Sequence, residues 1–133
     1  MSWTLALVRS IYAGWERGDF SSTAWADPEI EFVIADGPDP RRMNGLVAMS
    51  AGWREFLTAW ADYAVRAEQY REIGEGRVLV ILHATGRGRT SGAELEQAYR
   101  RGANVFDAAA GKVTRLAIYF DCEHAFADVG VRG

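Results

Sequence analysis

The first repeating pattern of apolar positions in the chain is helical. Between Thr4 and Arg17 an apolar side chain recurs every three or four residues, which places these side chains on one face of an amphipathic helix. They are Leu5, Val8, Ile11, Tyr12 and Trp15. Gly18 and Asp19 follow directly, so we expect the helix to end there and to bury its apolar face.

A shorter helix and a strand are predicted next. Asp19 or Ser21 can accept hydrogen bonds from the free amides of a first turn, which predicts a short helix through Trp25. Asp27 and Pro28 end that helix. Between residues 29 and 34 apolar and polar residues alternate, which is typical of a strand with one buried side. The buried side would carry Ile30, Phe32 and Ile34.

The segment from Ala35 to Asn44 is rich in turn-forming residues. Its Asp36-Gly37 and Asp39-Pro40 pairs supply left-handed and fixed-φ positions, so we expect a mobile loop. After Gly45 the helical spacing returns and predicts a second long helix that ends near residues 61–62. Its apolar positions are Leu46, Met49, Trp53, Phe56, Leu57 and Trp60.

The rest of the chain predicts strands over residues 65–73, 77–87, 94–107 and 112–120. Short connections that contain glycine separate them, which favours antiparallel pairing. Strands of this length with internal glycines such as Gly102 bend or bulge, so we expect a strongly curved sheet. Helices followed by a strand meander predict one α+β domain over residues 1–133.

Charge and composition exclude several classes of protein. The formal net charge is −3, which argues against a nucleic-acid binder because such proteins need a basic patch. No apolar run approaches the roughly 20 residues that span a bilayer, and no charged leader precedes the first helix, so we expect a cytoplasmic protein. Cys122 is the only cysteine, so an intrachain disulfide cannot form.

Four phrases of the sequence carry a family resemblance. They are YAGWERGDF at residues 12–20, DPEIEF at 27–32, the helix-opening Gly45, and GKVTRLAIYFD at 111–121. Together with the order of elements, they resemble the SnoaL-like branch of the nuclear-transport-factor-2-like superfamily. The resemblance implies a cystatin-like α+β barrel, in which helices and a cone-shaped sheet enclose a pocket for a small hydrophobic organic ligand. It also implies a homodimer and no cofactor, whereas the reaction differs between members of the superfamily.

The end of the last predicted strand carries the first candidate for acid–base chemistry. Tyr119 and Asp121 alternate onto one face with Arg115. If that face is concave, aromatic walls raise the pKa of the Asp121 carboxyl and make it an acid or base, with Tyr119 touching the substrate. SnoaL-type cyclases place an acid–base aspartate late in the chain, which Asp121 resembles. The alternative is that Asp121 caps a helix over residues 122–129.

His83 and Arg87 lie on one face of the predicted strand 77–87. A neutral imidazole among apolar residues can relay a proton, although a lone histidine in a strand is also typical of packing. Arg87 can hold a carboxylate or enolate oxygen of a substrate, or it is simply solvated beside its glycine turn.

Asp36 is the third catalytic candidate. It lies nine positions before Gly45, and ketosteroid isomerases carry their proton-abstracting aspartate at a similar distance from a helix-opening glycine. The oxyanion donors of those enzymes would fall near Ile11 and Gly102, where this chain has no donor side chain. The alternative is that Asp36 only forms a turn with Gly37.

The tryptophans complete the candidate site. Trp15, Trp53 and Trp60 are expected on helices that roof the sheet, where they either fill the core or line a pocket mouth. Residues 121–124 contain four potential metal-ligand types, but adjacent side chains diverge, so we expect no metal site. The glycine-rich residues 86–92 lack the lysine of a phosphate loop and favour a hairpin. The remaining hypotheses are a cofactor-independent isomerase, cyclase or hydrolase, a non-catalytic carrier or sensor, and a dimeric interaction module.

Overall fold

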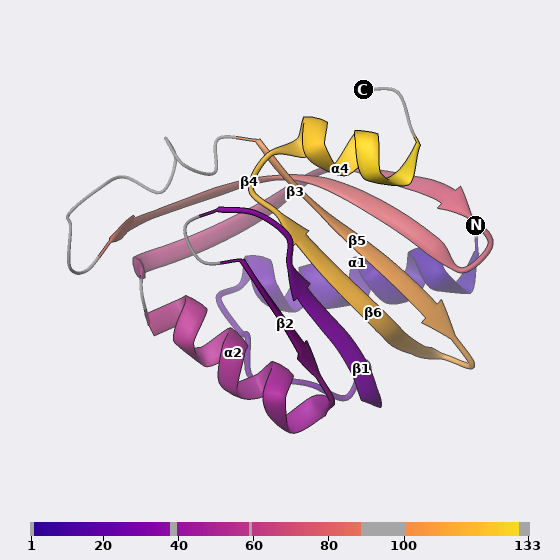
Figure 1. Ribbon diagram of the computed structural model, residues 1–133, viewed down its shortest axis with the longest axis horizontal. Coiled ribbons are helices and arrows are strands. Elements are labelled where there is room, and N and C mark those ends of the chain that lie inside the picture. The colour runs from indigo at the N-terminus through magenta and orange to yellow at the C-terminus, as the bar shows by residue number, and fades with distance from the viewer. Residues whose placement is uncertain (1, 38–39, 59, 89–100, 131–133) are drawn as a thin grey trace.

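The computed structural model describes residues 2–37, 40–58, 60–88 and 101–130. Figure 1 shows the helices and strands of these residues in order along the chain. They are α1 (Trp3–Glu16), β1 (Ala26–Ile34), β2 (Arg41–Asn44), α2 (Leu46–Thr58), β3 (Trp60–Gly74), β4 (Arg77–Gly88), β5 (Gly102–Ala109), β6 (Lys112–Tyr119) and α4 (Cys122–Val129).

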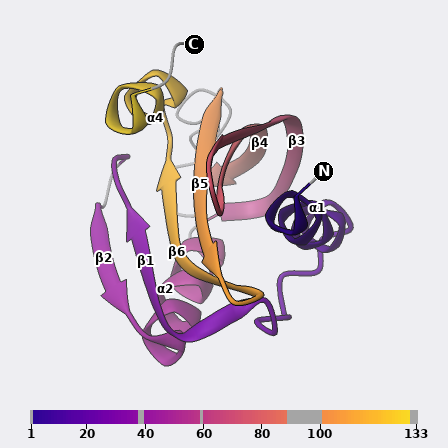
Figure 2. The ribbon, with the colours of Figure 1, turned by 90° about the vertical axis from the view of Figure 1, so that its right-hand side faces the viewer.

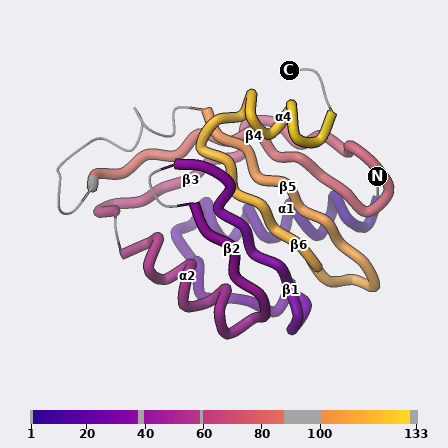
Figure 3. Tube along the Cα trace, viewed as in Figure 1, coloured from indigo at the N-terminus to yellow at the C-terminus, as the bar shows by residue number. Residues whose placement is uncertain are grey.

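The strands form one mixed sheet in the order β2-β1-β6-β5-β4-β3. β1 pairs with β6 in parallel, and the other neighbours are antiparallel. β2 and β3 are its two edges, so the sheet does not close on itself within the described ranges. Figure 3 follows the long β3–β4 hairpin across most of the molecule. The pairing of this hairpin shifts register three times, which bends the sheet. The predicted α+β class and curved sheet are confirmed.

The two faces of the sheet have separate cores. The concave face packs against α1 and α2, and residues 30, 32 and 34 of β1 point into this core as predicted. The outer face carries a second core, which is covered by Cys122, Ala125 and Phe126 of α4. Figure 2 shows α1 and α4 on opposite sides of β5. The inner strands β4, β5 and β6 therefore bury residues on both of their faces.

α1 forms because its ends are capped and its apolar face is continuous. The Ser2 hydroxyl accepts a hydrogen bond from the Leu5 amide at 3.1 Å, which satisfies one free donor of the first turn. The predicted positions Val8, Tyr12 and Trp15 are all buried. Beyond the helix Gly18 has a φ of +83°, which the chain needs to turn back toward the sheet.

The helix predicted between Asp19 and Trp25 is wrong, because this segment is irregular backbone that ends in a turn at residues 24–25. The Asp19 carboxylate accepts hydrogen bonds from both the amide and the hydroxyl of Ser21. This closed local turn competes with a helix. β1 consequently begins at Ala26, three residues earlier than predicted.

Two further boundaries differ from the prediction. The predicted loop contains the edge strand β2, which pairs with β1 over residues 41–44. Its arginines form ion pairs, Arg41 with Glu55 and Arg42 with Glu31. The strand therefore consists largely of polar residues and lacks the alternating apolar pattern by which a strand is predicted. α2 ends at Thr58, and Trp60 opens β3 instead of ending the helix.

Some predicted segments fall outside the described residues. The predicted strand over 94–107 is described only from residue 101 onward, and most of the loop over 86–92 is not described. Within the described part of the chain, no helix is long and apolar enough to cross a membrane.

Candidate ligand-binding cavity

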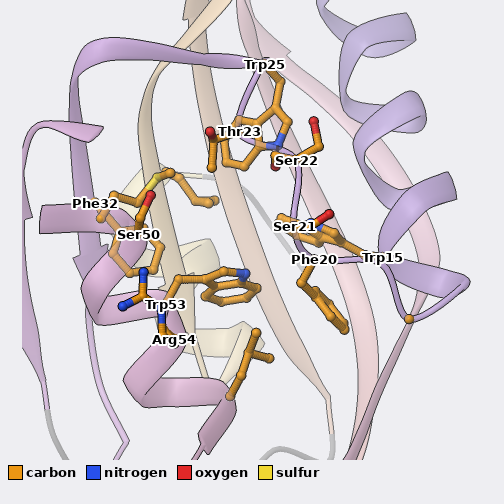
Figure 4. Close-up of a pocket in the computed structure, with 14 residues that line it drawn as sticks. Trp15, Phe20, Ser21, Ser22, Thr23, Trp25, Phe32, Ser50, Trp53 and Arg54 are labelled. Carbon is orange, nitrogen blue, oxygen red and sulfur yellow. Dashed lines mark hydrogen bonds between the residues drawn. The ribbon is translucent and has the colours of Figure 1, made fainter. Parts of the chain in front are cut away.

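A cavity of about 410 Å³ opens on the concave face, between α2, the end of α1 and the segment 18–25. Figure 4 shows α2 on one side of it and this segment on the other. β1 and β6 contribute Phe32 and Leu116 to its floor. The complete lining is Trp15, Gly18, Phe20, Ser21, Ser22, Thr23, Trp25, Phe32, Met49, Ser50, Trp53, Arg54, Leu57 and Leu116.

Five aromatic side chains from the described ranges line the cavity wall. Trp15 stands at their centre, with its ring centroid 5.3 Å from that of Trp53 and 6.0 Å from that of Trp25. Phe20 and Phe32 reach Trp53 at 6.0 and 5.9 Å. Trp15 is buried, whereas Trp53 is half-buried. The wall therefore presents flat apolar surfaces that favour a ligand with rings of its own.

Polar side chains gather at the rim of the cavity. Ser21, Ser22 and Thr23 come from the segment 18–25, and Ser50 and Arg54 come from α2 (Figure 4). Ser21, Ser22 and Arg54 are exposed, whereas the rings at the floor are buried. The described lining contains no carboxylate and no imidazole, so Arg54 is its single charged side chain.

The rim segment is held against the sheet by hydrogen bonds at its end. The Trp25 indole N–H donates to the Ser22 carbonyl at 2.9 Å. The Val113 amide of β6 donates to the Trp25 carbonyl at 2.8 Å, and the Lys112 ammonium donates to the Ala24 carbonyl. These bonds position the three hydroxyls although the segment has no helix or strand.

A buried polar pair lies behind Trp15. Asn104 Nδ2 of β5 donates to the Tyr12 hydroxyl at 2.7 Å, and both side chains are buried. The Tyr12 and Trp15 rings are 5.0 Å apart. Burial raises the pKa of Tyr12 well above its usual value, so its hydroxyl stays neutral. Sequence reasoning missed Asn104, although a single amide in the apolar run of residues 103–106 was a signal for a buried hydrogen bond.

The three catalytic candidates do not line this cavity. Asp121 is exposed and caps α4, where its carboxylate accepts the Glu123 amide at 3.0 Å, so the capping alternative is confirmed. His83 alternates with Leu79 and Ile81, which belong to the outer core, and so it lies on the outer face.

Asp36 belongs to a different cluster, which joins the end of β1 to the end of β6 and to α4. Its Oδ2 lies 2.9 Å from Nδ1 of His124, and its Oδ1 accepts the Phe120 amide. The Tyr119 hydroxyl donates to Asp128 Oδ2 at 2.9 Å, and that oxygen is 3.6 Å from Nε2 of His124. We call these four side chains, Asp36, Tyr119, His124 and Asp128, the α4 network.

Two members of the α4 network, His124 and Tyr119, have raised pKa values, so their protonated forms are favoured. The hydrogen bond that the Asp36 carboxylate accepts from the imidazole raises the pKa of His124, although burial partly opposes it. Burial, followed by the bond to Asp128, raises the pKa of Tyr119 to about 12. Cys122 next to this network is buried, and burial raises the pKa of its thiol. A thiolate nucleophile is therefore disfavoured there.

No group of three histidine, cysteine, aspartate or glutamate side chains converges as metal ligands in the part of the chain that the structure describes. In residues 121–124, Asp121 is exposed at the helix cap whereas Cys122 faces the outer core.

The candidate substrate-binding residues divide between the two faces. Trp15 and Trp53 line the cavity. Trp60 packs against the concave core without lining the cavity. Tyr119 lies in the outer core. Arg87 is exposed and lies on the same outer face, because it alternates with Ile81 and His83 along β4. The rim hydroxyls and Arg54 were missed, because the segment 18–25 was predicted to be a helix and Arg54 lies in an otherwise ordinary amphipathic pattern.

Comparison with known proteins agrees with this architecture. An NTF2-like protein from Burkholderia thailandensis has 20% identity and a TM-score of 0.76, with 99% of this chain and 100% of that chain covered. A protein assigned as a polyketide cyclase, from Xanthomonas campestris, has 20% identity and a TM-score of 0.67, with 96% of each chain covered. TerC, co-crystallised with polyporic acid, has 18% identity and a TM-score of 0.70, with 97% of this chain and 99% of that chain covered.

These likenesses establish the fold, and the family follows from the sequence itself. No curated protein matches the chain at a significant level. The sequence model of the SnoaL-like domain matches residues 8–116, which include most of α1, the rim segment, α2 and most of β6. The chain therefore belongs to the SnoaL-like domain family.

Proposed function

We propose that this protein binds a small, flat, largely apolar organic molecule in the cavity of the concave face. The observation that carries the proposal is the ring of Trp15, Phe20, Trp25, Phe32 and Trp53 around an open volume of about 410 Å³. Ligand pockets range from about 300 to 1,000 Å³, so this volume suits a molecule of two or three fused or linked rings.

A structural neighbour supports the same class of ligand. TerC, which shares the fold, was co-crystallised with polyporic acid, an organic acid. For the present chain the support comes from its own lining, where aromatic floor and hydroxyl rim are separated. Such a division favours a ligand with an apolar body and polar substituents at one edge.

We propose a carrier or sensor role ahead of acid–base catalysis by Asp121, His83 or Asp36. General acid–base catalysis needs the proton-transferring group within hydrogen-bond reach of the substrate. None of the three lines the cavity, and the described lining has hydroxyls and one guanidinium in their place. The predicted homodimer and cytoplasmic location stay predictions.

Calorimetric titration with 2-naphthalenemethanol, a neutral two-ring probe, tests the proposal. Trp53→Ala removes a ring from the cavity wall and should weaken binding at least about tenfold. Trp3→Ala is the matched control, because Trp3 lies at the start of α1 with 50% of its surface exposed and does not line the cavity. An unchanged affinity in Trp53→Ala, or an equal loss in Trp3→Ala, would contradict the proposal.

Recovery of the probe separates a carrier from an enzyme. After long incubation with the protein, mass spectrometry should find the bound probe chemically unchanged. A product that forms with the wild type and disappears in Asp121→Asn would reverse the order of the two hypotheses.

A further inference from the structure

We infer that Arg54 selects an aromatic carboxylate as the ligand, by binding its anionic group at the rim while the rings of the ligand pack on Trp53. This inference rests on the proposed function, since it names the class of molecule that the cavity takes. It concerns the polar rim, whereas the proposed function rests on the aromatic wall.

The position of Arg54 on α2 is the first argument. Ser50 and Arg54 are four residues apart, so they lie one turn apart on the same side of the helix. Both line the cavity together with Trp53, and Figure 4 shows the three side chains grouped on one side of it. A ligand ring packed against Trp53 therefore presents its edge to a guanidinium and a hydroxyl.

The carboxylates close to the rim are engaged elsewhere. Glu55, the next residue on α2, pairs with Arg41 at 2.7 Å. Asp19 accepts both the amide and the hydroxyl of Ser21. Among the described residues, neither carboxylate forms an ion pair with Arg54, so its charge faces the cavity rim without a fixed counter-ion.

The remaining rim groups suit the same anion. Ser22, Thr23 and Ser50 carry hydroxyls that can donate to a ligand oxygen, whereas the Ser21 hydroxyl already donates to Asp19. A guanidinium binds a carboxylate with two parallel hydrogen bonds. A phosphate ester would need more positive charge than one arginine supplies, and the net charge of −3 repels polyanions. A singly charged carboxylate therefore fits best.

Two probes with the same rings test this inference. 2-Naphthoate carries a carboxylate where 2-naphthalenemethanol carries a neutral hydroxymethyl group, and both are titrated calorimetrically near pH 7. Because Arg54 is exposed, the wild type should prefer the naphthoate by only about fivefold. This preference should shrink in about 0.5 M sodium chloride, which screens exposed charges.

Substitution assigns the preference to one residue. Arg54→Gln should abolish the preference by weakening the binding of the naphthoate, because the amide carries no charge. Arg54→Lys should keep part of it, since a lysine supplies the charge without the paired hydrogen bonds. Arg66→Gln is the control, because Arg66 is an exposed arginine of β3 outside the cavity lining.

The outcomes separate the inference from the function beneath it. Equal affinities of the wild type for the two probes, a preference that survives in Arg54→Gln, or an equal loss in Arg66→Gln each overturn the role of Arg54 and leave the cavity as a binding site. If the wild type binds neither probe, the proposed function fails together with the inference.

Discussion

The two faces of the sheet handle their polar groups in different ways. On the concave face, rings surround a hollow and the polar groups stand at its rim. On the outer face, α4 closes an apolar core, and the α4 network lies at the edge of that core with its members hydrogen-bonded to one another. The concave face therefore offers its polar groups to a ligand, and the outer face uses them to hold α4.

This difference distinguishes the cavity, which is a candidate binding site, from the α4 network, which only resembles an active site. Aspartates, a histidine and a tyrosine within hydrogen-bond distance are typical of acid–base chemistry. In this chain their bonds join the end of β1, the end of β6 and α4. They do not line the cavity, so the structure gives them a part in fastening the helix.

The largest expected effect comes from removing the ring that anchors α4. Phe126 is 3% exposed in the outer core, and Phe126→Ala should lower the free energy of unfolding by about 3 kcal/mol. Denaturant titration measures this loss. The surviving folded protein should bind 2-naphthalenemethanol within about twofold of wild type, because the concave face is unchanged.

Trp53→Ala is the matched variant on the other face, and it should show the reverse pattern. The Trp53 ring borders the cavity. Removing this ring should therefore reduce ligand affinity more than it reduces the free energy of unfolding. If Phe126→Ala weakens probe binding as much as Trp53→Ala does, the two faces are not independent and the comparison fails.

Removing a buried tyrosine hydroxyl on the concave face should cost more stability than removing one on the outer face. Tyr12→Phe removes the buried hydroxyl to which Asn104 donates, which should cost about 1 to 3 kcal/mol of stability. Tyr119→Phe removes a hydroxyl bound to Asp128, whose side chain is 48% exposed. Water can replace that partner, so the loss should stay below about 1 kcal/mol. Denaturant titrations of both variants would contradict this order if Tyr119→Phe were the more damaging.

Periodicity predicted which residues share a face but not which face is concave. The alternation in residues 29–34 and the spacing in α1 were confirmed, because a period of two or of 3.6 places side chains locally. The orientation of β6 in the sheet depends on its parallel pairing with β1, which lies far away in sequence. Tyr119 and Asp121 therefore lie away from the cavity, and the register shift in the β5–β6 pairing turns Val113 onto the concave core, opposite to Tyr119.

The cavity itself depends on contacts that a local pattern does not contain. The rim segment takes its shape from the Asp19 turn and from hydrogen bonds to β6. Asp36 and His124 meet across 88 positions of sequence. Caps, by contrast, are local, and for this reason the capping role of Asp121 was among the alternatives that the sequence alone could supply.

The smallest expected effect is the pH dependence of the α4 network. Asp36 raises the pKa of His124 above its usual 6.5, so folding favours the protonated imidazole. This contribution to stability is complete below about pH 6.5 and is lost as the pH rises through the raised pKa. The His124 side chain is 40% exposed, so the contribution should be less than about 1 kcal/mol.

Denaturant titrations between about pH 5.5 and pH 8.5 measure this contribution. The charged and titratable groups that face His124 are Asp36, Asp121, Asp128 and Tyr119. The three carboxylates all favour its protonation. His124→Gln should flatten the decline in stability, whereas His83→Gln should retain it, and these are the two histidines of the chain. A wild-type slope in His124→Gln would show that the imidazole does not fasten α4 through its charge, and the outer face would then owe its stability to the apolar core alone.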